Sequence, residues 1–555
     1  MLILFKTIFN ANSLNFPYAI HSFDICYNYP EIWFYSKFIY KFLFLFICIY
    51  LFYHISLRIF KIKPKTHESV NIEKSSLHLL VGNFTDNKSK IFIPEKGLFQ
   101  NILVTGTIGS GKTSSVLYPF VNQLVSYNSC SYGNLGMLIL DVKGNFCKYV
   151  KSTASKFNRT EDLIVIEIGN NLTYNPLDKP NLTPIVLANR LKTILTLFSS
   201  NNSDSYWLDK AEQVLTECIK LCRLYNDGYV TFLEIHKLIN YSDYYKEKIS
   251  KLRSVFLSGK LAQSDIYNLK TSLEFFENEF NSLDSRVLSI LKSEITRITG
   301  LFISDYNVQK TFCPSKGNIT FSGFDEVISD GKIVVLNMNI AEYKNLSKVI
   351  AAYLKLDFQT EVLAQLSKTK SIKPCVFICD EFHEYVTSTD ADFFAQSRES
   401  KCINIVATQS YTSLLNTLKE NSTLKVIIQN LVNKIWLRTD DLFTIEDIQK
   451  QIGKKEKIKI SHNISENAKE TRYSYITNSF ISRDSNISES LNKYTSLDYI
   501  YDTNFFSQRL QTFHCLAFLS DGNRIFSTCE LELYPYFKSN THNKVLKRKS
   551  QTSII

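Results

Sequence analysis

The stretch NILVTGTIGSGKTSS, residues 101–115, decides the fold. Its apolar start, residues 102–105, has the composition of a buried strand and leads into a turn with three glycines, a lysine and small hydroxyl residues. A strand, a glycine-rich turn and a helix in this order aim several backbone N–H groups at one point, which suits a phosphate. The spacing G-x-x-x-x-G-K-S/T is complete and predicts a P-loop. A glycine-rich turn without a ligand is the alternative, which is disfavoured because the chain has only 17 glycines in 555 residues.

Each position of this loop has an expected role in holding ATP. The glycines allow the tight turn and a close approach to phosphate. Lys112 can reach the β and γ phosphates, and the Thr113 hydroxyl can ligate Mg²⁺. The sequence therefore predicts ATP and Mg²⁺ as cofactors. The predicted nucleotide-binding residues are Gly106, Thr107, Ile108, Gly109, Ser110, Gly111, Lys112, Thr113 and Ser114.

Composition limits what surrounds the loop. A chain of 555 residues exceeds what one core usually supports, so two or three folded units are expected. The net charge of +11 suits an anionic partner such as DNA. Because the chain is also crowded with Lys, Asn, Ile, Tyr and Phe, as AT-rich coding produces, the charge supports DNA only weakly. The 12 cysteines include no C-x-x-C pair, so a zinc site is not expected, and Cys218, Cys222, Cys375 and Cys379 are interpreted as buried thiols in a reducing compartment.

An apolar segment precedes the loop. Residues 38–57, FIYKFLFLFICIYLFYHISL, have Lys41 as their only formal charge and the length of one membrane helix, about 20 residues. A signal peptide is the alternative, but the segment begins too far into the chain and lacks a small-residue cleavage site. Basic residues follow it directly, so the positive-inside rule predicts a single-pass inner-membrane protein with the P-loop domain in the cytoplasm, although lysines on the other flank count against this orientation. Those basic residues are Arg58, Lys61, Lys63 and Lys65, and no second span is assigned to residues 1–33.

A second motif lies in PCVFICDEFHEYV, residues 374–386, where an apolar run stops at Asp380 and Glu381. This is the Walker B pattern. Asp380 can hold Mg²⁺ through water, and Glu381 can polarise the water that attacks the γ-phosphate. An acidic strand end without a metal is the alternative, and a complete P-loop upstream disfavours it. The segment HEYVT lacks the second histidine of a zinc protease.

Two further strands are expected beside these motifs. GMLILDVKG, residues 136–144, predicts a buried strand that ends at Asp141. INIVATQS, residues 403–410, predicts a strand that ends at Gln409. Because the carboxyl ends of parallel strands meet at one edge of a sheet, Gln409 can sense the γ-phosphate. An ordinary strand cap is the alternative for this residue.

The order of elements predicts an α/β protein with an insertion. Residues 183–300 have apolar positions at helical spacing and no strand between them, which predicts an all-helical domain. TIEDIQKQIG, residues 444–453, predicts a helix that Gly453 ends, and the next forty or so residues, rich in Lys, Asn and Ser, predict a mobile loop. Residues 512–537 predict a hairpin that turns at Asp521 and Gly522. The expected parts are an N-terminal segment with the anchor at 1–65, a nucleotide-binding domain at 75–182 and 301–538, the helical domain at 183–300, and a basic tail at 539–555 that either touches phosphate or stays solvated.

Together these motifs resemble the TraG/TraD-type coupling ATPases of type IV secretion and conjugation. The likeness runs from about residue 75 to residue 535. Its specific part is D-x-K-G after the second strand, the long helical insert, and S-R followed by a strand into T-Q-S, since the Walker motifs are shared by many ATPases. The resemblance implies a RecA-like P-loop domain related to FtsK and HerA motors. It also implies a homo-hexameric ring on the cytoplasmic face of the membrane, which delivers DNA, a relaxase or another secreted protein to a type IV secretion channel.

The resemblance also assigns roles to residues. It implies Lys112, Glu381, Gln409 and Arg398 as catalytic residues, and Thr113 and Asp380 as metal ligands. Arg398 is a candidate arginine finger that reaches a neighbouring subunit. A surface arginine is the alternative, and Arg438 is a competitor for the role. The chain departs from the family at Asn145, where an acid is usual, and in showing one membrane span where many members have two.

Two classes of function remain open. The first is a translocation ATPase that moves DNA or a DNA–protein complex into a channel, with DNA bound independently of sequence. The second is a docking receptor for protein cargo, in which ATP supports only assembly, and a DNA pump of the FtsK or HerA kind is a lesser option. Glu381 favours the ATPase, because a scaffold needs no hydrolytic base.

Overall fold

The computed structural model describes residues 77–537 with short gaps, and a few residues before them. The gaps are 130–131, 142, 199–204, 258–261, 369–371, 467–470, 475, 477 and 483–486, and the earlier described residues are 31, 34–35, 38–39, 41–47 and 50. The chain divides into two compact units, Met1–Glu73 and Lys74–Ile555. The sheet and the helices that follow all belong to the second unit.

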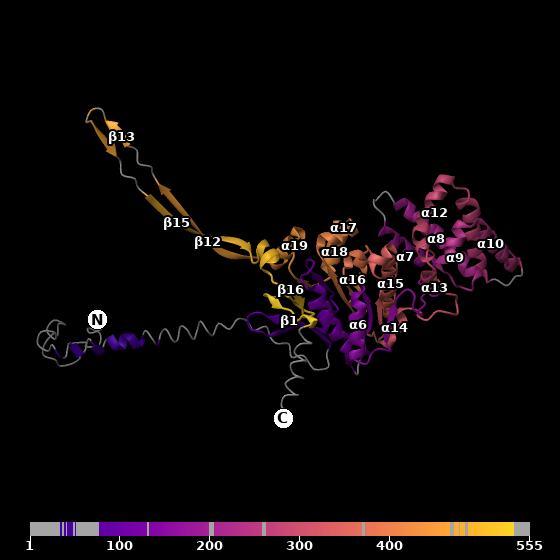
Figure 1. Ribbon diagram of the computed structural model, residues 1–555, viewed down its shortest axis with the longest axis horizontal. Helices are drawn as coiled ribbons and strands as arrows, with labels where there is room; N and C mark the ends of the chain where they lie inside the picture. The colour runs from indigo at the N-terminus through magenta and orange to yellow at the C-terminus, as the bar shows by residue number, and fades with distance from the viewer. Residues whose placement is uncertain are drawn as a thin grey trace, which may run out of the picture. The chain divides into compact units, whose positions relative to one another are not determined.

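A sheet of twelve strands organises the second unit (Figure 1). Its order is β2-β1-β18-β16-β11-β3-β10-β9-β6-β8-β7, and β17 pairs with β16. From β11 to β7 all neighbouring strands are parallel, which confirms the predicted mainly parallel α/β fold. The bounds are β1 (His78–Phe84), β2 (Lys90–Pro94), β3 (Ile102–Thr105), β6 (Gly136–Leu140), β7 (Leu163–Ile166), β8 (Ile333–Leu336), β9 (Cys375–Cys379), β10 (Cys402–Thr408), β11 (Asn433–Trp436), β16 (His514–Ser520), β17 (Ile525–Ser527) and β18 (Leu531–Glu532).

The parallel strands are buried on both faces. In β3, Ile102 and Val104 join one hydrophobic cluster, while Leu103 joins a second cluster on the opposite face. In β6, Met137 and Leu138 divide between the two clusters in the same way. Such strands are nearly continuous apolar runs because helices cover both sides of a parallel sheet. This explains why the strands were recognisable in the sequence.

Helices cover both faces of the sheet and connect its parallel strands. On the first face, α5 and α6 pack against the cluster that contains Val104. On the other face, α15, α17 and α18 contribute to the cluster that contains Leu103. The bounds are α4 (Glu95–Leu98), η1 (Lys112–Leu117), α5 (Tyr118–Ser126), α6 (Asn145–Lys156), α14 (Phe324–Asp330), α15 (Ile340–Lys368), η5 (Phe382–Glu384), α16 (Asp390–Gln396), α17 (Tyr411–Leu418), α18 (Asn421–Asn430), α19 (Leu442–Ile452) and η6 (Phe505–Arg509).

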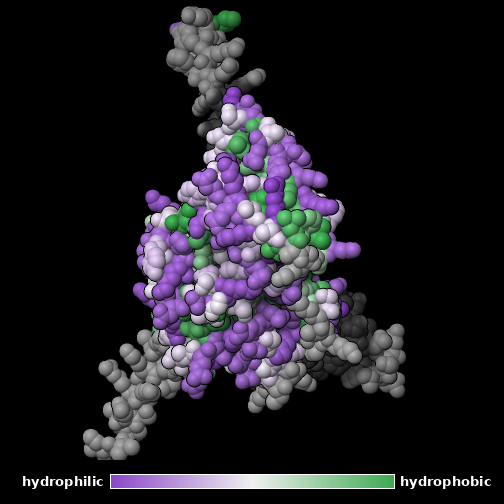
Figure 2. All heavy atoms as spheres, turned by 90° about the vertical axis from the view of Figure 1, so that its right-hand side faces the viewer, coloured by the Kyte–Doolittle hydropathy of each residue, from purple (hydrophilic) through white to green (hydrophobic). Residues whose placement is uncertain are grey.

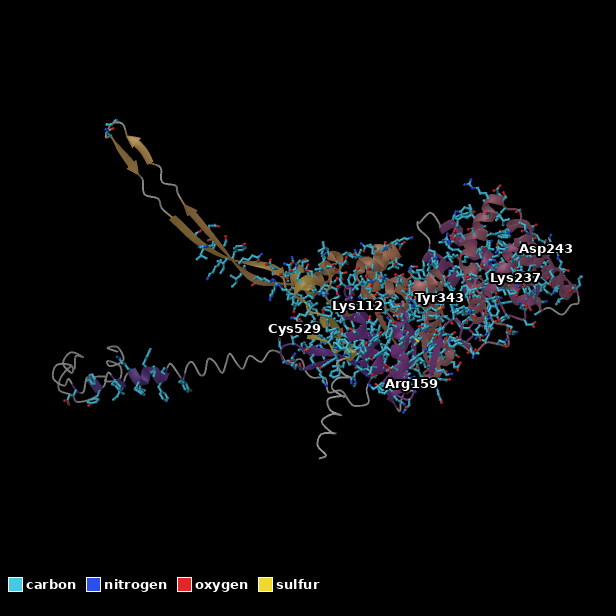
Figure 3. The ribbon with its side chains drawn as sticks, viewed as in Figure 1. Lys112, Arg159, Lys237, Asp243, Tyr343 and Cys529 are labelled. Atoms are coloured by element: carbon cyan, nitrogen blue, oxygen red, sulfur yellow. The ribbon has the colours of Figure 1, made fainter. Side chains whose placement is uncertain are left out.

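A run of helices separates β7 from β8 in the sequence. It carries the labelled residues Lys237 and Asp243 in Figure 3, whereas Lys112 lies in the part that contains the sheet. Seen from the side of these helices, polar side chains cover most of the surface, with apolar groups between them (Figure 2). The bounds are α7 (Pro184–Thr196), α8 (Ser205–Tyr225), α9 (Phe232–Asn240), α10 (Ser242–Leu257), α11 (Gln263–Glu274), η3 (Phe275–Phe280), α12 (Ser285–Thr299), η4 (Gly300–Phe302) and α13 (Tyr306–Phe312).

Buried charges join this helical run to the sheet. Asp357 on α15 is fully buried. Its carboxylate forms ion pairs with Lys179 at 2.7 Å and with Arg190 on α7 at 3.1 Å. The Tyr174 hydroxyl donates to the same carboxylate at 2.9 Å. Burial opposes ionisation of Asp357, but the two cations outweigh it and hold its pKa below the usual value. The apolar cluster around these groups continues from the sheet into the helical run without a break.

The region predicted as a mobile loop is instead a β-ribbon. β12 (Lys454–Glu466) and β15 (Ile487–Tyr499) pair antiparallel along their whole length. Residues directly opposite share a face, so Ile458, Ile460, Leu491 and Leu497 gather on one side of the ribbon. The loop prediction was wrong because polar composition concealed this alternation. Two shorter pairs are β4 (Asn128–Ser129) with β5 (Gly133–Asn134), and β13 (Thr471–Ser474) with β14 (Ser479–Ser482).

Two smaller sequence predictions are confirmed. The helix expected before Gly453 is α19, and Gly453 ends it with a φ of 94°. The hairpin expected at Asp521 and Gly522 joins β16 to β17, and Gly522 has a φ of 97°. A left-handed backbone of this kind favours glycine. The basic tail, residues 539–555, lies outside the described residues.

The predicted membrane anchor is not supported. No helix within the described part of the chain is long and apolar enough to cross a bilayer. Residues 40, 48–49 and 51–57 of that segment lie outside the described residues. The prediction of a single-pass inner-membrane protein, which rested on the length of the apolar run and on the basic residues that follow it, is therefore wrong.

Asn101 joins the P-loop strand to its neighbours. It is buried with a φ of 61°, a backbone conformation that asparagine tolerates better than most residues. Its Nδ2 donates to the carbonyl oxygens of Phe394 and Asn430 at 3.0 and 2.9 Å. Its Oδ1 accepts hydrogen bonds from Asn404 at 2.7 Å and Ser397 at 3.2 Å. One side chain thus connects β3 with β10, α16 and α18.

We predict that Asn101→Ala lowers the free energy of unfolding by about 3 kcal/mol, because it leaves buried partners unsatisfied and strains the backbone. Urea denaturation followed by circular dichroism measures the change. Asn101→Gly is the matched variant: it removes the same hydrogen bonds but tolerates the positive φ, so its loss should be smaller by about 1 kcal/mol. An unchanged midpoint for Asn101→Ala would contradict the role of this side chain.

Candidate active site

The P-loop begins where β3 ends and closes where η1 begins. Gly109 and Gly111 adopt φ values of 77° and 102°, which explains glycine at these positions. The Lys112 ammonium is buried against the loop and donates to the carbonyl oxygens of Gly106 at 2.5 Å and Thr107 at 3.3 Å. Burial lowers the pKa of Lys112, against the opposing effect of the acids nearby. The loop therefore has the cation and the backbone geometry that a phosphate requires.

The two Walker motifs meet directly. The Thr113 hydroxyl donates to Asp380 Oδ2 at 2.7 Å, although the residues are 267 positions apart. The carboxyl ends of β3 and β9 lie at the same edge of the sheet, which brings them together. Asp380 is 2% exposed, and burial raises its pKa to about 6 while the Thr113 hydrogen bond opposes this. A hydroxyl and a carboxylate in this arrangement are the oxygen ligands that Mg²⁺ prefers.

Glu381 follows Asp380 in an unusual backbone conformation. Its φ is 51°, which is uncommon outside glycine and asparagine and marks a site held in place by its surroundings. The carboxylate accepts from Lys143 Nζ at 3.1 Å through Oε1 and from Gln409 Nε2 at 3.3 Å through Oε2. Burial raises the pKa of Glu381, but Lys112 and Lys143 outweigh this effect and the net pKa is lowered. Glu381 is therefore ionised and oriented at neutral pH.

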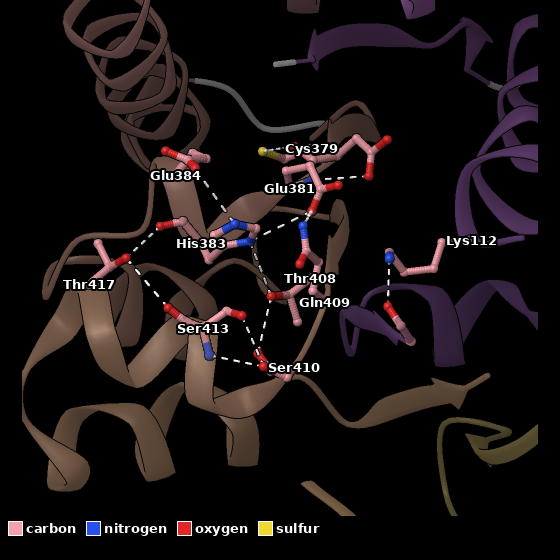
Figure 4. Close-up of polar contacts among 12 residues, drawn as sticks. Lys112, Cys379, Glu381, His383, Glu384, Thr408, Gln409, Ser410, Ser413 and Thr417 are labelled. Atoms are coloured by element: carbon pink, nitrogen blue, oxygen red, sulfur yellow. Dashed lines mark hydrogen bonds and ion pairs between the residues drawn. The ribbon is translucent and has the colours of Figure 1, made fainter. Parts of the chain in front are cut away.

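His383 lies behind this carboxylate (Figure 4). Its Nδ1 is 3.7 Å from Glu381 Oε2 and 3.4 Å from the Thr408 hydroxyl, and its Nε2 is 3.7 Å from Glu384. Burial lowers the pKa of His383, against the two carboxylates. The imidazole, whose lowered pKa favours the neutral form, thus lies among Glu381, Glu384 and Thr408.

Lys143 is a site residue that the sequence interpretation did not assign. The Asp141 carboxylate accepts from the backbone N–H groups of Lys143 and Phe146, each at 3.0 Å, and so fixes the turn before α6. The turn aims Lys143 at Glu381. The motif D-x-K-G carried the signal, because an acid that caps its own turn presents the next lysine at a strand end. Asn145 begins α6 and contributes no side chain to this group of contacts among the described residues.

The two arginines differ in position. Arg398 is exposed in the turn before β10, at the amino end of that strand, whereas Gln409 follows its carboxyl end. A strand of this length spans about 20 Å, so Arg398 lies far from the P-loop of its own chain. The Arg438 carbonyl accepts from Thr107 N–H at 2.9 Å, beside the P-loop. A cavity of about 680 Å³ adjoins this point and is lined by Thr107, Ile108, Gln409, Ser410, Ser413, Arg438, Asp440, Asp441 and Ser507.

Comparisons with known proteins agree with this fold. Residues 374–493 match the family model described as the TraM recognition site of TraD and TraG. The unbound conjugative coupling protein TrwBdeltaN70 has 14% identity and a TM-score of 0.51, over 80% of this chain and 87% of its own. This chain resembles the TraG/TraD-type coupling proteins. The plasmid coupling protein TrwB in complex with ADP and Mg²⁺ gives the same values, and its complex with the GTP analogue GDPNP has 13% identity over the same shares with a TM-score of 0.51. No curated protein matches the sequence.

These matches show that the chain shares the fold of TrwB. Identities this low do not by themselves show a shared function. The matched model covers β9, β10, β11 and the helices between them, where Asp380, Glu381 and Gln409 lie. The P-loop itself precedes the matched residues. The resemblance to coupling proteins therefore rests on the sequence of the Walker B side and on the fold of the whole sheet.

We predict that Asp380→Asn stabilises the ligand-free protein at high pH. The pKa of Asp380 is about 6 in the folded chain and 3.8 ordinarily, so its stabilising contribution is full below pH 3.8 and is lost as pH rises through 6. At pH 8 the ionised carboxylate costs roughly 3 kcal/mol, and Asn avoids this cost. Urea denaturation at pH 4, 6 and 8 checks the trend. Asp392→Asn, an exposed aspartate on α16, should change nothing, and a variant less stable than wild type at pH 8 would refute the burial cost.

Proposed function

We propose that this protein is an ATPase of a type IV secretion or conjugation system that couples ATP hydrolysis to the transfer of DNA or a DNA–protein complex. The observation that carries the proposal is the meeting of Thr113 and Asp380 at 2.7 Å, with Glu381 beside them. The TrwB-like fold and the match to the TraD and TraG model support the biological setting.

ATP and Mg²⁺ are the proposed cofactors, as TrwB has been solved with ADP and Mg²⁺. The N–H groups of the P-loop and Lys112 would hold the phosphates, which requires Lys112 to exchange its carbonyl partners for phosphate oxygens. Thr113 and Asp380 would hold the Mg²⁺, whose charge would also offset the cost of the buried Asp380 carboxylate. A bound Mg²⁺ supplies charge neutralisation on the phosphates.

Glu381 is the proposed general base. Its lowered pKa keeps it ionised, and the contacts from Lys143 and Gln409 fix both of its oxygens. Accepting a proton from water requires one of these donors to release its oxygen. Gln409 is the proposed sensor of the γ-phosphate, and its position just after the carboxyl end of β10 supports this role.

A homo-hexameric ring is part of the proposal. Arg398 lies at the opposite edge of the sheet from its own P-loop, so any role as a finger requires a neighbouring subunit. Arg438 beside the P-loop is the alternative. The helical part, residues 183–300, is the proposed cargo-recognising domain because none of its described residues takes part in the contacts of the P-loop, Asp380 and Glu381. The proposed partners are DNA bound independently of sequence, a relaxase or other secreted protein, and a type IV secretion channel.

A docking receptor for protein cargo is the second candidate. The family model that matches residues 374–493 is described by partner recognition, which favours some docking role. A receptor would need nucleotide for assembly but no hydrolysis. An FtsK or HerA-type DNA pump would hydrolyse ATP without a secretion channel. Glu381, ionised and oriented, favours hydrolysis.

We predict that Lys112→Ala abolishes nucleotide binding, because the phosphates lose their cation. Glu381→Gln should bind ATP but turn over at least about a hundredfold more slowly, because the base is lost. Phosphate release measures turnover, and a fluorescent ATP analogue measures binding. Glu399→Gln, an exposed acid far from the P-loop, should match wild type. Full turnover in Glu381→Gln would remove this residue from the role of base.

We also predict that the ATPase rate per chain rises with protein concentration and with added single-stranded or double-stranded DNA. A site completed by a neighbour is nearly silent in a monomer, and DNA should nucleate the ring. Binding mainly to phosphates should be indifferent to sequence and weaken steeply with salt. The Arg398→Ala variant should bind nucleotide, but its ATPase rate per chain should no longer rise with protein concentration or DNA. A rate per chain independent of both concentration and DNA would leave the docking receptor ahead.

A further inference from the structure

Five aromatic side chains gather beside the helix that follows the P-loop, and they come from four segments of the chain. Tyr118 on α5 stacks on Tyr149 of α6 at a centroid distance of 4.0 Å. Tyr536 packs edge-on against both rings, at 5.0 and 5.4 Å. Phe537 contacts Phe513 at 5.7 Å with the ring planes 70° apart. The aromatic group extends from the flank of α5 to the P-loop.

Phe513 touches the P-loop itself. A Cβ on Gly111 would lie 2.7 Å from Phe513 Cδ1, so the phenyl ring rests on the last glycine of the loop. The Phe513 N–H donates to the Ser110 carbonyl at 3.4 Å, and the Phe513 carbonyl accepts from Leu533 N–H at 2.8 Å. The backbone of Phe513 is thus held between the loop and the C-terminal segment that carries Phe537.

The conformation of Phe513 is costly. Its φ is 66°, and the left-handed region costs a bulky residue about 1–2 kcal/mol. Strain of this kind persists where the surroundings impose it, and it is concentrated at functional sites. A residue free to relax would place the ring elsewhere, away from Gly111. The backbone contacts with Ser110 and Leu533 that impose this strain therefore keep an aromatic ring on the phosphate loop.

Part of this aromatic group is open to solvent. Phe537 is 44% exposed and Tyr536 is 37% exposed, while Phe513 is half-buried. β16 runs antiparallel to β11, so Phe513, just before β16, lies at the same edge of the sheet as the carboxyl ends of the parallel strands. An exposed aromatic surface thus adjoins the loop on its α5 side, while Asp380 and Glu381 follow β9, on the other side of β3 in the sheet order.

We infer that Phe513 and Phe537 form a stacking surface for the base of the bound nucleoside triphosphate. The inference rests on the proposed function, since it takes the P-loop as the phosphate site. With the phosphates in the loop, the ribose and base must lie beside it, and an aromatic face stabilises a base that stacks on it. Phenylalanine has no polar group to read the base edges, so ATP and GTP should bind with affinities within a fewfold of each other.

The test compares ligands with and without a base on the full-length chain. The probes are the non-hydrolysable analogues of ATP and GTP, and inorganic triphosphate, each with Mg²⁺, and calorimetry gives the Kd. Phe537→Ala should raise the Kd of both analogues about tenfold, the effect of losing roughly 1.4 kcal/mol of stacking, and leave the Kd of triphosphate unchanged. Phe513→Leu should act in the same direction. Tyr534→Ala, an exposed aromatic on the same segment, is the matched control and should change neither Kd.

The outcomes separate this inference from the proposed function. Equal weakening of the analogues and triphosphate in Phe537→Ala would mean that the loop is disturbed, and would overturn the stacking surface. Unchanged Kd values for the analogues in Phe537→Ala would overturn the stacking surface as well. If this variant still binds triphosphate, the phosphate site is intact and the proposed function stands. Wild-type protein that binds neither analogue nor triphosphate would refute the proposed function, and the stacking surface with it.

Discussion

The hydrogen bond from Thr113 to Asp380 depends on the register of the central sheet. Its 2.7 Å length requires β3 and β9 to end at the same level, although β10 lies between them. β10 pairs in parallel with both, so one shift of register on either side would separate the two residues by about 3.3 Å. The contacts of Asn101 with β10 and its flanking helices fix this level from the opposite end of β3.

The same edge concentrates features that oppose folding. Asp380 is ionised at neutral pH despite burial, Lys112 is a buried cation, and Glu381 and Phe513 have left-handed backbones. Each costs on the order of 1–3 kcal/mol. The apolar clusters on both faces of the sheet offset these costs. A phosphate and a divalent cation would relieve part of the electrostatic cost, so the edge is preorganised for ligands of that charge.

Local sequence patterns were sufficient for part of this structure. The apolar runs that end at Asp141, Asp380 and Gln409 are strands whose ends converge, as their composition predicts. Glycine at the P-loop and at Gly453 reflects a local backbone requirement. Composition misled twice: an apolar run was interpreted as a membrane span, and a polar run hid the alternation of β12 and β15.

Other features depend on contacts that no local pattern encodes. Phe513 contacts Gly111, about four hundred residues earlier in the chain, because β16 pairs with β11 and so brings Phe513 to the P-loop. Nothing in the local sequence TFHC, residues 512–515, predicts this contact. Lys143 stood within a quoted motif, but its role became visible only when β6 placed it opposite Glu381. The distance of Arg398 from its own P-loop follows from strand direction, which the sequence predicted, although the role of this residue stays a prediction.

The buried carboxylate of Asp357 has a mechanical consequence. It holds Arg190 of α7 on one side and belongs to α15 on the other, within one continuous apolar cluster. Because buried ion pairs and close packing resist deformation at this point, a load on the helices would be transmitted in part to the sheet. If the helical part binds cargo, as proposed, a force on that cargo would strain the strands whose carboxyl ends carry Thr113 and Asp380.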